Sequence, residues 1–213
     1  MVVIIPLRNQ SKNNYYELRF ALRSICIHNP IERCLLVGGK PEWYTGEHIQ
    51  HVDYVSEFKE QNIRDKTVTA ARIIKGDFLF ANDDHFLLTP YTGVHNKGLL
   101  SDTLKNRQPN GSYTRLLQNT LSYFGDVENV DTHCPMLMNS EGVERTVFDW
   151  PKWGLGFKTT YAQVNKIPSV YHPDQKVADV SQVKDGLYFS TYEGAKNLTL
   201  LLDMFPVKSI FEK

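Results

Sequence analysis

Short apolar runs alternate with longer segments of helical periodicity in the first part of the chain. Residues 16–28 and 63–74 place apolar side chains three and four positions apart, which predicts two helices. Asn29 and Pro30 end the first, and Gly76 ends the second. The β-branched and aromatic runs, each expected to form a buried strand, are residues 2–6, 33–37, 52–55 and 77–81. This alternation predicts an α/β fold with a doubly wound, mostly parallel sheet flanked by helices.

The pattern changes after Pro90, where glycine, asparagine and aromatic residues become frequent and the periodicity weakens. Residues 112–124 still predict one helix, and residues 195–205 fit a short helix or a strand. Residues 125–173 give a mixed pattern interrupted by prolines. The length of 213 residues suits a single domain, so we expect residues 1–213 to form one unit with a mixed C-terminal region.

Composition narrows the function classes without choosing one. The 24 basic and 24 acidic residues balance, so no overall charge attracts the chain to nucleic acid or to an anionic membrane. Three cysteines without close pairing argue against a disulfide framework and a structural zinc site. The N-terminus does not have the pattern of a signal peptide, and no apolar run is long enough to span a membrane. We therefore expect a cytoplasmic protein.

Two adjacent carboxylates interrupt apolar sequence at the end of the fourth expected strand. Asn82, Asp83 and Asp84 follow the run 77–81 directly, and another apolar run begins at Phe86. A polar turn would explain the composition, but no glycine or proline lies between Asp77 and Thr89. Carboxylates near a core are costly unless a cation offsets their charge. A divalent metal that carries a diphosphate is such a cation, which predicts a Mn²⁺ or Mg²⁺ site.

The other expected strand end near this motif carries Pro6 and Arg8. Ligands of open α/β sheets bind outside the carboxyl ends of the strands, so both ends are expected to face one crevice. Asp84 is the expected direct metal ligand. Asp83 or Asn82 would touch a sugar or ribose.

Several segments together resemble glycosyltransferases of the GT-A class. The run VIIP at residues 3–6 is similar to the opening strand of that class, and residues 63–80 resemble its helix and strand before the acidic motif. More narrowly, YELRFALRSI at 16–25, NDDHF at 82–86 and THCP at 132–135 resemble the Stealth family, which transfers sugar phosphates. The resemblance covers roughly residues 1–140.

The resemblance implies a GT-A-like fold and a metal-dependent transfer of sugar from a nucleotide-diphosphate sugar to an acceptor hydroxyl. Residues 1–90 would bind the nucleotide sugar, and residues 91–213 would bind the acceptor. The opening acidic motif of Stealth proteins is replaced here by PLRN at 6–9, which favours ordinary glycosyl transfer over sugar-phosphate transfer. A Stealth-like sugar-phosphate transferase and a non-catalytic nucleotide-sugar-binding module remain as alternatives.

The acceptor would be a bacterial or phage glycan or a hydroxymethylated base in phage DNA. The expected local basic strip for DNA consists of Lys97, Lys105, Arg107 and Arg115.

The remaining candidate residues would bind the metal and the donor or would act on the acceptor. Many GT-A enzymes bind the metal through a histidine of the C-terminal segment, and the resemblance makes His172 the candidate third metal ligand. The candidates to pair with the diphosphate or the base are Arg8, Arg64, Lys66 and Lys176, of which Arg64 and Lys66 are expected to begin a helix. The candidate bases for the acceptor hydroxyl are Asp131, His133 and Asp149. Trp153 belongs to an aromatic segment that fits either a stacking platform or core packing.

Overall fold

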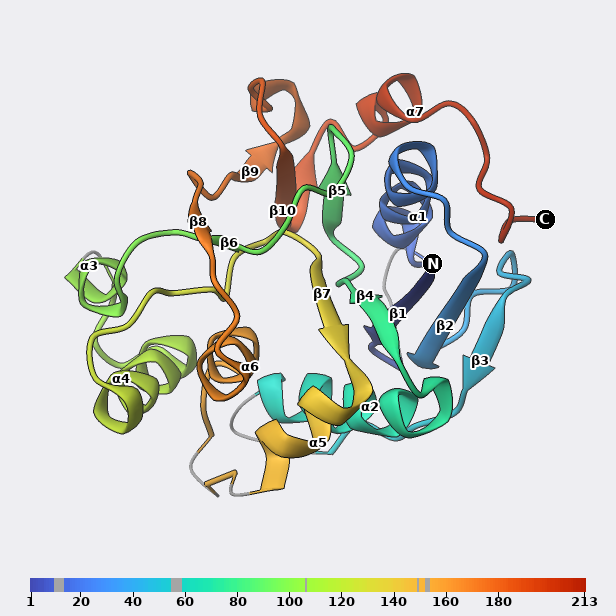
Figure 1. The fold of residues 1–213 in the computed structure, drawn as a ribbon. Coiled ribbons are helices and arrows are strands. Elements are labelled where there is room, and N and C mark those ends of the chain that lie inside the picture. The colour runs from blue at the N-terminus through green and yellow to red at the C-terminus, as the bar shows by residue number, and fades with distance from the viewer. Residues whose placement is uncertain (10–13, 55–58, 106, 149, 152–153) are drawn as a thin grey trace.

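A mostly parallel sheet of five strands forms the centre of the protein (Figure 1). The computed structural model describes residues 1–9, 14–54, 59–105, 107–148, 150–151 and 154–213. The strand order is β3-β2-β1-β4-β7, and only the edge strand β7 runs antiparallel to its neighbour. The strands are β1 (Val2–Leu7), β2 (Arg33–Gly38), β3 (Glu47–Ile49), β4 (Asp77–Phe80) and β7 (Met136–Asn139).

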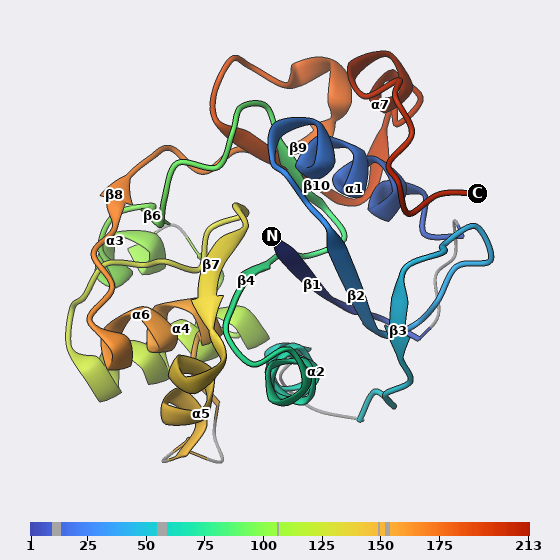
Figure 2. The ribbon, with the colours of Figure 1, turned by 45° about the vertical axis from the view of Figure 1, so that its right-hand side comes forward.

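Helices cover both faces of this sheet. The side chains of β1 alternate: Val3 and Ile5 pack in the core with α1 (Tyr16–His28), whereas Ile4 packs with α2 (Lys59–Ile74). In two views the helices α1 and α2 lie on opposite sides of the strands (Figures 1 and 2). The expected α/β fold with a doubly wound, mostly parallel sheet is therefore confirmed.

Two smaller sheets each pair a strand from the first half of the chain with strands from the second half. The second sheet pairs β5 (His85–Leu87) with β10 (Tyr188–Lys196), which also pairs with β9 (Lys176–Asp179). A short two-stranded sheet joins β6 (His95–Asn96) to β8 (Val170–Tyr171). The remaining helices are α3 (Leu100–Lys105), α4 (Ser112–Phe124), α5 (Ser140–Phe148), α6 (Phe157–Asn165) and α7 (Leu200–Met204), with a 3₁₀ turn at Val180–Gln182.

The expected third strand at 52–55 is wrong, since β3 lies at Glu47–Ile49 and residues 52–54 are not in a strand. The side chains of Val52 and Tyr54 are exposed, and Asp53 binds a lysine of α2, so these apolar residues do not mark a core strand. Helices α1 and α4 begin and end where the sequence predicted. Residues 195–205 contain the end of β10 and the short helix α7.

The cysteines are free thiols, as expected. Within the described ranges, no helix has the length and apolar character needed to cross a membrane.

Chain order reverses its direction across the sheet between β1 and β4. From β1 the chain proceeds outward to β2 and β3, and it then returns through α2 to place β4 on the other side of β1. The carboxyl ends of β1 and β4 flank this switch point, because the two strands are parallel with Val3 opposite Leu79. Open α/β sheets bind their ligands at such a point.

Candidate functional site

The acidic motif forms a turn at the carboxyl end of β4. The His85 amide donates to the Asn82 carbonyl at 3.3 Å, and the Asn82 amide donates to His85 Nδ1 at 3.2 Å. His85 is fully buried, and its ring accepts the hydrogen bond that closes the turn. The buried Asn82 Oδ1 has no hydrogen-bond partner among the residues described. The segment is therefore a turn, as the simpler interpretation expected. It also contains an amide oxygen without a hydrogen-bond partner, which is an atom that can bind a metal ion.

The carboxyl group of Asp83 is unfavourable in its charged form. Burial and the neighbouring charges of Asp84 and Glu17 raise the pKa of Asp83 to about 7, and Arg8 only partly opposes them. Such a group gains stability from any added cation. Arg8 follows β1 and reaches Asp83 electrostatically, so the two strand ends do face each other across the switch point.

Asp84 differs from Asp83 because it has cationic and hydrogen-bonding partners. Ser190 Oγ donates to its Oδ2 at 2.8 Å, and Lys176 Nζ lies 3.3 Å from the same oxygen. Burial raises the pKa of Asp84, but His85, Lys176 and His133 outweigh this effect and the pKa is lowered. The side chain retains 23% exposure, so an ionised carboxylate remains accessible at the edge of the turn.

The structure does not bring His172 to this carboxylate pair. Its Nδ1 pairs with the Pro173 carbonyl at 2.9 Å, and its ring packs 5.0 Å from Tyr188 and 5.5 Å from His95. Over the part of the chain that is described, no three His, Cys, Asp or Glu side chains converge closely enough to hold a metal ion. A metal at Asp83 and Asp84 would have to draw its other ligands from water and substrate, which Mg²⁺ commonly does.

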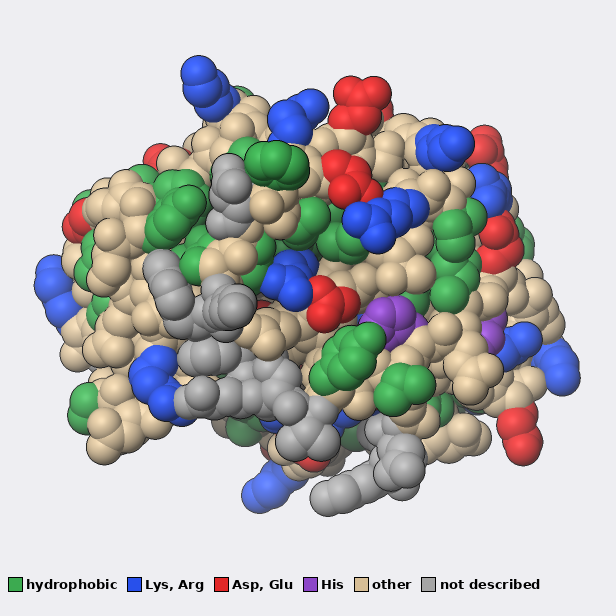
Figure 3. All heavy atoms as spheres, turned by 90° about the horizontal axis from the view of Figure 1, so that it is seen from below, with side chains coloured by type: hydrophobic (Ala, Val, Ile, Leu, Met, Phe, Trp, Pro, Cys, Tyr) green, Lys and Arg blue, Asp and Glu red, His purple; other side chains and the backbone are tan. Residues whose placement is uncertain are grey.

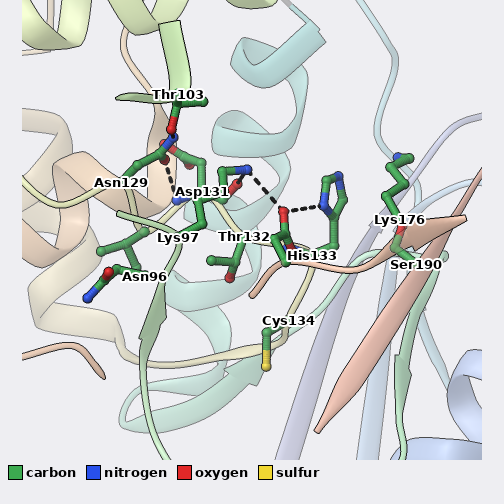
Figure 4. Close-up of polar contacts among 12 residues, drawn as sticks. Asn96, Lys97, Thr103, Asn129, Asp131, Thr132, His133, Cys134, Lys176 and Ser190 are labelled. Carbon is green, nitrogen blue, oxygen red and sulfur yellow. Dashed lines mark hydrogen bonds and ion pairs between the residues drawn. The ribbon is translucent and has the colours of Figure 1, made fainter. Parts of the chain in front are cut away.

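His133 lies beside the acidic turn and is oriented by Asp174. Its Nδ1 lies 2.7 Å from Asp174 Oδ2, and its backbone amide donates to Asp174 Oδ1 at 2.9 Å. Lys97 Nζ lies 3.1 Å from the same Oδ2, so a cation completes the cluster. Figure 4 shows the His133 ring between Lys97 on one side and Lys176 with Ser190 on the other. We name these three residues the His133–Asp174–Lys97 cluster.

The imidazole of His133 suits proton acceptance at neutral pH. Burial is the main cause that lowers its pKa, and Lys97 and Lys176 lower it further, although Asp174 opposes them. Because Nδ1 is engaged by a carboxylate, the neutral ring places its proton there and leaves Nε2 as the acceptor. The rings of His133 and His85 lie 6.5 Å apart, so this acceptor is close to the acidic turn.

Asp131 is turned away from this cluster. Its Oδ1 accepts from the backbone amide of Lys158 at 3.0 Å, and its Oδ2 accepts from Thr159 Oγ1 at 2.7 Å. A Cβ on Gly156 would lie 2.1 Å from the same Oδ2, so the carboxylate packs directly on the start of α6. Carboxylates at a helix N-terminus satisfy its unpaired amides. Asp131 therefore caps α6, so His133 is the better candidate base of the two that the structure describes.

Lys66 holds the end of β1 and does not begin a helix, since α2 starts at Lys59. Its buried ammonium contacts the Leu7 carbonyl and Asp53 Oδ1, each at 2.5 Å. This approach needs Gly38, whose added Cβ would lie 2.6 Å from the ammonium. Both contacts occupy the ammonium, which is therefore not directed to a diphosphate.

Arg64 is likewise inside α2 and is engaged locally. Its Nη2 lies 2.5 Å from Asp65 Oδ1, and its guanidinium carbon lies 5.1 Å from the centre of the Trp150 ring. Pro6 is buried in β1 and Arg8 is exposed. Two predicted site residues, Asp149 and Trp153, lie outside the described residues.

A groove of about 950 Å³ borders the site on its C-terminal side. Asp174 and Lys176 line it, and the same two side chains contact His133 and Asp84. The half-exposed ring of Tyr192 also lines it, 5.3 Å from the Lys176 ammonium. The wall is fixed by Gln175, whose side chain exchanges two hydrogen bonds with the backbone of Lys184. The groove therefore adjoins both the acidic turn and the candidate base.

Asp174 and Ser190 are candidate site residues that the sequence did not reveal, and Lys97 was predicted only as part of the basic strip. Asp174 is 41 positions from His133, and no spacing rule connects them. The one available signal is local: Asp174 follows Pro173 and lies two positions before Lys176, which was already a candidate. An alternating polar pattern before a strand places such side chains on one face.

No family model matches the chain, and no curated protein matches it.

Proposed function

We propose that the protein is a glycosyltransferase that takes its donor, a nucleotide-diphosphate sugar, at the switch point between β1 and β4. The observation that supports this most is the placement of Asn82, Asp83 and Asp84 at the carboxyl end of β4, beside the end of β1. The raised pKa of Asp83 and the orphaned oxygen of Asn82 favour an added cation there. This donor set of hard oxygen atoms fits Mn²⁺ or Mg²⁺. When bound, the metal neutralises charge on the departing diphosphate.

The proposed role of His133 is to accept the proton of the acceptor hydroxyl at Nε2. The acceptor oxygen then forms its bond to the anomeric carbon while the bond from that carbon to the diphosphate oxygen breaks. The nucleoside diphosphate leaves with the electron pair, and His133 retains the proton until solvent removes it. Asp174 holds the ring in the required tautomer and stabilises the imidazolium that forms.

Charge placement favours a glycan over DNA as the acceptor. Lys97 retains 10% exposure and is paired with Asp174, and Lys105 is paired with Asp102. Two of the four residues of the expected basic strip are thus neutralised within the protein. Acidic and basic side chains are interspersed over the face in Figure 3. The groove beside His133 offers a tyrosine ring and polar groups, which suit a saccharide.

The test replaces Asp84 and measures donor binding. In Asp84→Ala, we expect nucleotide-sugar affinity in Mn²⁺ to fall about 100-fold, since an interaction with a charged group contributes about 1.5–3 kcal/mol. Calorimetry across uridine, guanosine, cytidine and thymidine diphosphate sugars, with and without Mn²⁺, measures this loss. The control Asp102→Ala removes an exposed carboxylate that is paired with Lys105. The proposed metal-dependent donor site would be refuted if Asp84→Ala bound the nucleotide sugar as tightly as wild type. Equally tight binding by the wild type after a chelator has removed the metal would also refute it.

A non-catalytic nucleotide-sugar-binding module is the second candidate. The observation in its favour is that, among the described residues, no third His, Cys, Asp or Glu side chain joins the adjacent carboxylates. Such a module binds the donor but releases no nucleoside diphosphate during long incubation with water or glycan. Detection of slow, Asp84-dependent hydrolysis of the donor would exclude it.

A further inference from the structure

Lys158 is a buried lysine that contacts the backbone on both sides of His133. It is the second residue of α6, and 5% of the residue is exposed. Its ammonium donates to the carbonyl of Thr132 and, at 2.9 Å, to the carbonyl of Cys134. These are the residues immediately before and after His133.

A buried ammonium in this position is costly. Burial lowers the pKa of Lys158, and no ion pair joins it to a carboxylate within the residues described. Removal of a charge from water costs several kcal/mol unless hydrogen bonds and nearby charges offset the loss. The two carbonyls are its direct partners, and Asp131 contributes the largest compensating charge. The hydrogen bonds that offset this cost tie the ammonium to the backbone on both sides of His133.

The start of α6 fixes the backbone around His133 at three points. The Asp131 carboxylate binds the amide of Lys158, while the Lys158 ammonium binds the carbonyls of Thr132 and Cys134. Lys97 adds a 2.6 Å bond to the Asp131 carbonyl from the other side. The backbone of residues 131–134 is therefore clamped, and the His133 side chain projects from the clamped segment toward Asp174.

We propose that Lys158 is a positioning residue that holds the imidazole of His133 in its bond to Asp174 and within reach of the acceptor. Its effect on turnover rests on the proposed function, whereas its effect on the orientation of His133 does not. The ammonium acts through the backbone and does not touch substrate. Displacement of a reacting group by about 1 Å can reduce a rate about 100-fold.

The test is Lys158→Met, which keeps the length of the side chain and removes its charge and donors. In protein with ¹⁵N-labelled histidine, wild-type His133 is expected to show one tautomer, with Nδ1 protonated and Nε2 free. The signal is assigned by its absence in His133→Gln. In Lys158→Met we expect a mixture of tautomers, a kcat that falls about 100-fold, and an unchanged KM for the donor.

The matched control is Thr160→Val on the same helix. Thr160 Oγ1 donates to the Gly156 carbonyl at 2.7 Å, and the residue is buried like Lys158, with 2% against 5% exposed. Among the described hydrogen bonds, none joins its hydroxyl to residues 131–134. We expect Thr160→Val to retain the wild-type tautomer and kcat. If Lys158→Met does not fold, Lys158→Gln retains a neutral amide NH₂ as hydrogen-bond donor, and an intermediate mixture is expected.

A Lys158→Met protein with the wild-type tautomer of His133 overturns the proposal. The spectrum needs no substrate, so it decides the positioning role even if wild-type protein transfers no sugar. If Lys158→Met shows a mixture of His133 tautomers but the wild-type protein transfers no sugar, the positioning role of Lys158 is supported and the proposed function is refuted. A mixed tautomer with wild-type kcat would refute the link between His133 and turnover.

Discussion

Asp84 and Asp174 are both close to His133, but their environments differ. Asp84 has one hydroxyl donor and one ammonium 3.3 Å away, and it keeps 23% exposure. Asp174 binds the ring and backbone amide of His133 and pairs with Lys97, and it keeps 12% exposure. Asp84 is thus a carboxylate whose partners can be exchanged for a ligand. Asp174 is a carboxylate whose partners fix another side chain.

The pKa values express the same difference. Burial raises the pKa of both groups, and nearby cations outweigh it in both. For Asp174, the bonds from His133 lower the pKa far below its ordinary value, so the carboxylate is ionised at neutral pH. A charged carboxylate at Nδ1 stabilises the imidazolium that forms when a neutral imidazole accepts a proton. A carboxylate that is to bind a metal ion, as proposed for Asp84, needs partners that the metal can displace.

The largest expected effect comes from Asp174→Asn, which tests the fixed side of the comparison. An asparagine amide in this place favours the wrong tautomer of His133 and leaves Lys97 without its counter-charge. We expect kcat to fall about 10⁴-fold, the size seen when the carboxylate of a histidine–aspartate pair is replaced by an amide. Donor affinity, measured by calorimetry, should stay within threefold of wild type. A comparable loss of donor affinity would mean that Asp174 belongs to the donor site.

Glu212 provides a third carboxylate, equally well held but remote from the acidic turn. Its carboxylate binds Arg23 through both oxygens, at 2.9 and 2.8 Å, with side chains 2% and 5% exposed. Loss of one partner from a buried ion pair costs about 3–5 kcal/mol. We expect Glu212→Gln to lower the free energy of urea unfolding by about 3 kcal/mol while kcat is unchanged. A large fall in kcat would show that tight carboxylate pairing anywhere in the fold affects turnover.

The pH dependence of this loss has a definite sign. Burial raises the pKa of Glu212, but Arg23 and the Ser209 amide outweigh it, so the folded pKa lies below the unfolded one. The stabilisation is therefore full above the unfolded pKa of about 4.3 and disappears as pH falls through the folded value. The difference in unfolding free energy between wild type and Glu212→Gln should be constant from pH 7 to 5 and shrink below about pH 4.

Local patterns predicted the elements better than they predicted the partners. The apolar spacing that defines α1 and α4 is contained within each helix, so the sequence determined their bounds. The third strand was misplaced because Val52 and Tyr54 are apolar in composition but exposed. The sequence offered Asp131 and His133 as alternative bases and gave no signal that His133 has a carboxylate partner. In the fold, the start of α6 binds Asp131, and a loop 41 positions from His133 supplies Asp174.

The smallest expected effect tests whether the partners of Asp84 exchange. Lys176 and Asp84 are each about a quarter exposed, and a partly exposed ion pair contributes about 0.2–1 kcal/mol. Lys176→Met removes a cation that competes for Asp84, so we expect Mn²⁺ alone to bind about two- to fivefold more tightly. If Lys176 then pairs with the diphosphate, the same variant should bind the nucleotide more weakly. Opposite shifts in the two titrations would show that one carboxylate passes from lysine to metal as the donor arrives, whereas Asp174 keeps its partners throughout.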